Sequence, residues 1–84
     1  MTDRTTTPPY TGMQGQYLAF IYYYTKLNRQ APAEADMQRY FQVTAPSVHQ
    51  MVLTLEKLGF ISRVPGAPRS IQLLIVADQL PPLD

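Results

Sequence analysis

Four polar side chains recur at steps of three or four residues in one segment of this sequence: Ser47, Gln50, Thr54 and Lys57. Side chains at such spacing share one face of a helix. A carboxamide can pair with both N6 and N7 of adenine, hydroxyls can reach bases or phosphates, and an ammonium group binds phosphates. His49, on the flank of this face beside Leu53, can donate a hydrogen bond to a guanine acceptor or to a phosphate. These residue types suit the reading of nucleic-acid bases, although a solvated helix face would carry the same stripe.

Enzymatic chemistry is poorly supported by the sequence. Ser47 and His49 are two residues apart, so on a helix their side chains point in different directions and cannot form a nucleophile pair. Three acidic residues fit helix capping or pairing with Lys57 as well as they fit acid and base roles: Glu34, Asp36 and Glu56. We therefore expect no enzymatic activity and no catalytic residue.

Metal and membrane chemistry are also disfavoured. The sequence has no cysteine and one histidine among 84 residues, which leaves no ligand set for a thiolate or imidazole site. The longest apolar and aromatic run, residues 17–24, is far shorter than the about 20 residues that span a bilayer. No secretory signal is visible at the start of the sequence. We expect no metal, no cofactor, no small-molecule substrate, no membrane partner and a cytoplasmic location.

Positive charge is concentrated in one part of the chain, although the formal net charge is only +1. Between positions 57 and 77 there are three basic residues and no acidic one: Lys57, Arg63 and Arg69. Such clustering is typical of a surface that binds phosphates. We expect phosphate contacts from these residues and from Arg39, and we include Ser70, next to Arg69, among the site candidates. The alternative is that the two arginines of the predicted hairpin only keep it soluble and protect its edge.

Hydrophobic periodicity predicts two helices in the first half of the chain. Apolar residues at three- and four-residue steps predict a helix over about 13–28, with Thr11 as a candidate start. A second helix of about eight residues should begin near Ala33, after Pro32 breaks the pattern. Four of its side chains are expected in the core: Ala35, Met37, Tyr40 and Phe41.

The second half predicts a third helix and a hairpin. Thr44 suits the N-cap of a helix over 44–58, and the amides at that helix start also favour a phosphate. Pro46 fits its first turn and Gly59 its end. The segments 60–64 and 70–76 are rich in β-branched and aromatic residues and flank a loop of proline and glycine, which predicts a β-hairpin.

This order of elements predicts the fold class. Three helices followed by a two-stranded β-hairpin indicate a mostly helical α+β domain, the winged helix-turn-helix. We expect this domain over residues 11–77, between flexible tails at 1–10 and 78–84. In such a fold the helix 44–58 would lie in the major groove of DNA and the hairpin 60–76 would form the wing.

Several motifs stand at concordant spacing along the chain: LAFIYYY (18–24), Asn28, Pro32, ADM (35–37), TAPSVH (44–49), LEKLGFI (55–61) and RSIQL (69–73). Together they resemble the N-terminal DNA-binding domain of LexA-type repressors, over about residues 13–74. The resemblance implies a winged-helix DNA-binding module. It does not carry over the self-cleaving peptidase domain of such repressors, which has no counterpart in these 84 residues.

Three positions depart from the family pattern. Arg29 and Gln42 stand where glycine is common, and Ala31 stands where a proline precedes Pro32. We expect these differences to alter turns and not contacts.

The function predicted from these observations is sequence-specific binding of double-stranded DNA by a small transcriptional regulator of the repressor type. The alternative is a winged-helix protein–protein interaction module without DNA binding, which the low net charge and Leu53 would suit. Tyr22, Tyr23 and Tyr24 cannot all be core residues on one helix, because three consecutive positions sweep most of its circumference. Exposed tyrosines there are a candidate surface for a homodimer.

Overall fold

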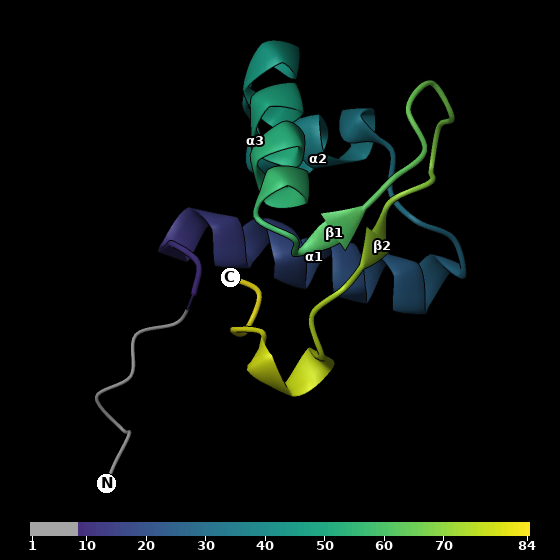
Figure 1. Ribbon diagram of the computed structural model, residues 1–84. Coiled ribbons are helices and arrows are strands. Elements are labelled where there is room, and N and C mark those ends of the chain that lie inside the picture. The colour runs from purple at the N-terminus through teal and green to yellow at the C-terminus, as the bar shows by residue number, and fades with distance from the viewer. Residues whose placement is uncertain (1–8) are drawn as a thin grey trace, which may run out of the picture.

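The computed structural model describes residues 9–84, so most of the predicted 1–10 tail lies outside the described residues. Its elements, in chain order, are α1 (Gly12–Asn28), α2 (Glu34–Phe41), α3 (Ala45–Lys57), β1 (Ile61–Ser62), β2 (Gln72–Leu73) and the short 3-10 helix η2 (Ala77–Gln79). Three helices followed by a two-stranded antiparallel sheet confirm the predicted α+β winged-helix class. In Figure 1, α3 and the hairpin loop rise from the same side of α1, and η2 lies on the opposite side.

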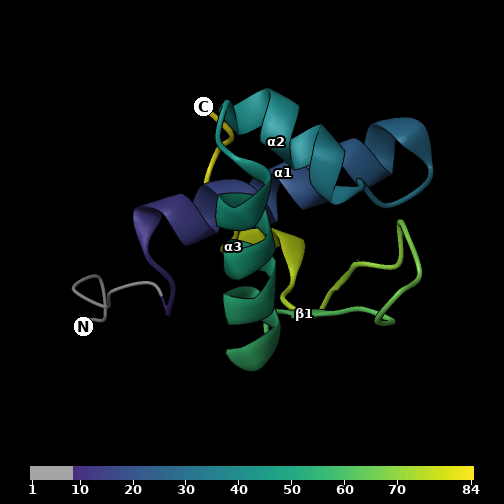
Figure 2. The same cartoon turned by 90° about the horizontal axis from the view of Figure 1, so that it is seen from above.

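Local capping explains where α1 and α3 begin. The Thr11 hydroxyl accepts a hydrogen bond from the Gln14 amide, and the Gln14 side chain accepts one from the Thr11 amide, which together form a capping box. Thr44 caps α3 through the Ser47 amide, as its position before Pro46 predicts. Figure 2 shows that α3 crosses α1 at a steep angle.

The core lies between α1, α2, α3 and β1. Its fully buried side chains come from all four of these elements: Leu18, Ile21, Met37, Val48, Val52, Leu55 and Ile61. Two expectations for α2 are wrong, because Ala35 is exposed and Tyr40 is about half exposed. Asp36 takes a buried place on this helix, where partners satisfy its charge.

The strands are shorter than the predicted 60–64 and 70–76. They pair Ile61 with Leu73 and Ser62 with Gln72. Beyond that point Arg69 has a left-handed backbone, with φ of 56°, which is incompatible with a continuing ladder. At this point a side chain replaces the strand-to-strand backbone hydrogen bond: the Ser70 hydroxyl accepts a hydrogen bond from the Val64 amide at 2.9 Å.

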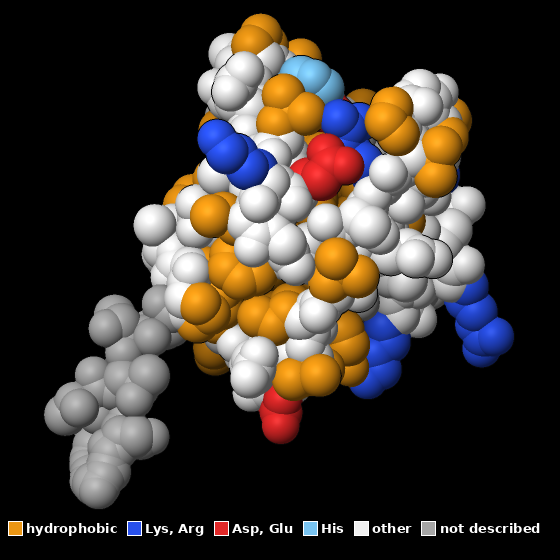
Figure 3. Space-filling model, in the orientation of Figure 1, with side chains coloured by type: hydrophobic (Ala, Val, Ile, Leu, Met, Phe, Trp, Pro, Cys, Tyr) orange, Lys and Arg blue, Asp and Glu red, His pale blue; other side chains and the backbone are white. Residues whose placement is uncertain are grey.

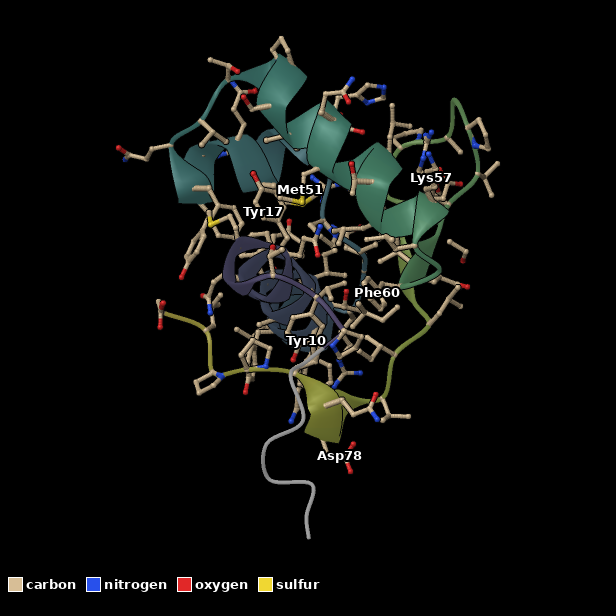
Figure 4. The ribbon with its side chains drawn as sticks, turned by 60° about the vertical axis from the view of Figure 1, so that its left-hand side comes forward. Tyr10, Tyr17, Met51, Lys57, Phe60 and Asp78 are labelled. Atoms are coloured by element: carbon tan, nitrogen blue, oxygen red, sulfur yellow. The ribbon has the colours of Figure 1, made fainter. Side chains whose placement is uncertain are left out.

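The end of the chain packs against the start of α1. The Tyr10 hydroxyl donates to the carbonyl of Gln79, and the Gln16 side chain donates to the carbonyl of Pro82 at 2.9 Å. The Tyr10 ring also packs edge-on against Phe60, as Figure 4 shows. The division into a domain over residues 11–77 and flexible tails stays a prediction. Over residues 9–84 the structure contains no helix with the length and apolar character that a membrane span requires.

Candidate nucleic-acid interface

Helix α3 forms a ridge with a buried side and a polar side. Val48, Val52 and Leu55 are fully buried beneath it. Four polar residues of the predicted face are all exposed: Ser47, Gln50, Thr54 and Lys57. The 3.6-residue period thus places the hydrophobic anchors and the polar face on opposite sides of the helix.

A shallow hollow of about 480 Å³ lies along one side of this ridge. Ser47, Gln50 and Thr54 line it together with Gln14 from the first turn of α1. Sequence reasoning missed Gln14, because its place beside α3 depends on how α1 and α3 pack. Its spacing from Thr11 is that of a capping box, which the structure confirms and which gives no sign of a place beside α3.

A second hollow, of about 390 Å³, lies between the hairpin loop on one side and the start of α2 with one residue of α3 on the other. His49 lines this hollow and not the first one, and its Nδ1 lies 3.1 Å from Oε2 of Glu34 on α2. Arg63, Arg69 and Ser70 line it from the hairpin side. The structure therefore brings seven of the candidate residues into two groups, one at each hollow, whereas Arg39, Thr44 and Lys57 line neither.

The two hairpin arginines are engaged within the molecule. The Arg63 Nε donates to Oε1 of Glu56 at 2.9 Å. The Arg69 Nη1 donates to Oδ2 of Asp36 at 3.0 Å. Between them the loop tip is apolar and exposed, with 60% of Val64 accessible, and Figure 3 shows mostly orange and white atoms there. The predicted basic wing thus has its cations at its base and none at its tip.

Asp36 is the only charged side chain buried within residues 9–84, at 8% exposure. Burial alone would raise the pKa of its carboxyl group. The hydrogen bond from the Ala33 amide and the positive charges of Arg69 and Arg39 outweigh burial, so the pKa is lowered. Arg39, a predicted phosphate contact, pairs with this carboxylate while most of its own side chain stays exposed.

Thr44 and Ser70 have local structural partners. The Thr44 hydroxyl donates to the Ser47 hydroxyl at 2.9 Å in addition to capping α3. Ser70 closes the hairpin loop, since its hydroxyl lies 2.9 Å from the carbonyl of Ala67. Lys57 has neither role and lies exposed in the last turn of α3 (Figure 4).

The chemistry of the two hollows is that of hydrogen bonding and charge. Within residues 9–84 the structure holds no cluster of three or more histidine, cysteine or acidic side chains suited to a metal ion. The groups available on and beside α3 are carboxamides, hydroxyls, one imidazole and one ammonium group.

Comparison with known proteins confirms the resemblance predicted from the motifs. Over 64 residues the chain is 39% identical to the LexA repressor of Thermosipho africanus, and over 64 residues 38% identical to the LexA repressor of Thermosipho melanesiensis. Each match covers 76% of this chain and 32% of the relative, so the chain corresponds to about a third of the length of these repressors. No protein-family model matches the chain.

Proposed function

We propose that this chain binds double-stranded DNA in a sequence-specific manner, as a small transcriptional regulator with α3 in the major groove and the hairpin as a wing. The observation that carries the proposal is the exposed polar ridge of α3 in a winged-helix fold. The similarity to LexA repressors supports it at the level of the family.

The dimensions of α3 fit this role. The major groove is about 12 Å wide and admits one α-helix. The ridge is 13 residues long, and its hydrophobic anchors hold it on the core. The hollows on its two sides leave room for the walls of a groove to pass.

Each candidate residue receives a role in the proposal. Gln50 would pair with adenine, and Ser47 and Thr54 would contact bases or phosphates beside it. His49 faces the second hollow, where it would donate to a guanine or to a phosphate. The exposed cations Lys57 and Arg39 would bind phosphates, and the positive end of the α3 dipole beside Thr44 would favour one there. Phosphate contacts by Arg63 and Arg69 would require their internal ion pairs to open.

Binding to a random duplex pool tests this proposal. Fluorescence anisotropy at several salt concentrations should give a slope of log K against log salt of about −2 to −4, because each neutralised phosphate contributes about −0.9. Selection of the bound fraction should then enrich one sequence. A salt-insensitive complex, or a bound pool as diverse as the input, would contradict the proposal.

A protein-interaction role is the second candidate, and one observation favours it. The hairpin tip and the segment after β2 expose the apolar residues Val64, Leu74 and Val76. Tyr23 and Leu27 of α1 are exposed as well and would be the surface of a homodimer. Sedimentation of the chain alone and with duplex DNA distinguishes a homodimer from a complex with DNA. A homodimer that persists when Tyr23 and Leu27 are both changed to serine would not use this surface.

A further inference from the structure

The carboxylate of Asp36 holds two parts of the fold together. Asp36 lies in the first turn of α2, and its Oδ2 accepts the Ala33 amide at 2.8 Å. The same oxygen lies 3.0 Å from Nη1 of Arg69, which is 33 positions further along the chain and belongs to the hairpin. The start of α2 and the part of the hairpin that leads into β2 are therefore both bound to the buried carboxylate of Asp36.

Arg69 reaches three separate parts of the molecule with one nitrogen atom. Besides Asp36, its Nη1 donates to the hydroxyl of Tyr24 on α1 at 3.0 Å and to the carbonyl of Ala31 before α2 at 3.2 Å. Its guanidinium carbon also lies 5.9 Å from the centre of the Tyr24 ring. A phosphate contact from a surface arginine does not need such a set of internal acceptors.

The backbone at Arg69 supports the same view. Its φ of 56° lies in the left-handed region, which is strained for any residue with a side chain. Glycine would occupy this conformation without that strain. The contacts of the guanidinium group offset the strain and so hold the turn in place.

We propose that Arg69 is a positioning residue that clamps the hairpin to α2 through Asp36 and thereby fixes the width of the hollow between the hairpin and the start of α2, which His49 of α3 also lines. The effect on DNA rests on the proposed function, but the clamp itself does not. On the other arm of the loop, the pair of Arg63 and Glu56 ties the hairpin to α3, so the loop is held at both ends.

The first test needs no DNA. The Val64 amide donates to the Ser70 hydroxyl and the Ala67 amide to the Val64 carbonyl. Hydrogen exchange of these two amides should become about tenfold faster in Asp36→Asn and in Arg69→Gln, and the double variant should add little, because both single changes open the same clamp. Arg69→Gly relieves the backbone strain, so it keeps the fold and should still release the loop. Arg29→Gly is the matched control, since Arg29 is an exposed arginine with φ of 60° at the end of α1. Unchanged loop exchange in Asp36→Asn and Arg69→Gly would overturn the clamp.

The second test distinguishes positioning from phosphate contact. If Arg69 positions the hairpin, Arg69→Gln and Asp36→Asn should both weaken DNA binding severalfold while the salt slope stays that of the unchanged protein. If Arg69 instead contacts a phosphate, Arg69→Gln should make the slope shallower by about 0.9, and Asp36→Asn should free the guanidinium and strengthen binding. That second pattern would overturn the proposal. Absence of DNA binding by the unchanged chain would refute the proposed function and leave the exchange experiment as the test of the clamp.

Discussion

The Nε of Arg63 lies 2.9 Å from Oε1 of Glu56, so the residue that follows β1 is tied to the last turn of α3. Both side chains are partly buried, with 18% and 35% exposure. The pair brings a hairpin residue against the helix that carries the polar ridge, and its acidic member, Glu56, directly precedes Lys57 in the sequence.

Glu56→Gln tests what this pair contributes. Loss of a partly buried ion pair should lower the free energy of unfolding by about 0.5–1 kcal/mol. The change also frees Arg63 for a phosphate, so the salt slope of DNA binding should steepen by about 0.9. Urea unfolding and anisotropy measure the two effects. Asp78→Asn is the control, because it removes one negative charge at an exposed position in η2, and an equal change in slope there would contradict the role of Arg63.

Gln50→Ala tests the proposed reading face. The side chain is exposed, so stability should stay within about 0.5 kcal/mol of the unchanged protein. Loss of a bidentate base contact should weaken binding to the selected sequence by about 1–3 kcal/mol and relax the preference at one base pair. Gln30→Ala, at an exposed position beyond the end of α1, is the control. An equal loss of affinity for all DNA sequences would indicate that Gln50 contacts a phosphate and not a base.

Much of the helical framework was predictable because its signals are local. Thr44 caps α3 through a residue three positions away, and the buried and exposed sides of α3 follow from the helical period. The ends of α1 and α2 come close to the predicted ones for the same reason.

The parts that escaped prediction depend on residues far apart in the sequence. Arg69 meets Asp36 across 33 positions, and no pattern near either residue indicates the other. Charge clustering alone therefore predicted free cations at the hairpin, where the structure has ion pairs. Likewise, Gln14 joins the site only because α1 and α3 cross at that point.

Gln42 has a left-handed backbone conformation that is strained for a residue with a side chain. It has φ of 56° as the residue that ends α2. Gln42→Gly should therefore raise the free energy of unfolding by about 1 kcal/mol, since glycine adopts this conformation without strain. Gln38→Gly, in the interior of α2, should lower it by about 1 kcal/mol. Thermal unfolding of both variants checks the pair, and a loss of stability in Gln42→Gly would contradict the strain argument.

Asp36 should make stability depend on pH in the acid range. Its pKa is lowered in the folded state, so the ionised carboxylate stabilises the fold above the pKa of the unfolded chain, about 3.9. That stabilisation should be lost as the pH falls through the lower pKa of the folded state. Urea unfolding should be measured between pH 6 and pH 2, a range of about four units around the ordinary pKa of an aspartate. As the pH falls, the free energy of unfolding should decline less steeply for Asp36→Asn than for the unchanged protein. Asp78→Asn, at an exposed position in η2, should leave the decline as it is.

Gly15 allows the end of the chain to pack on α1. A Cβ atom there would lie 2.7 Å from Cε1 of Tyr10 and 3.0 Å from Cγ of Pro81, so both side chains would have to move. Gly15→Ala should therefore detach residues 79–84 and speed exchange of the Asp84 amide, which donates to Gln16. The amides within α1 should stay protected, because alanine favours a helix by about 1 kcal/mol over glycine. At Gly12 an added Cβ meets open space, so Gly12→Ala is the matched control. Equal protection of Asp84 in both variants would show that the end of the chain does not depend on this contact.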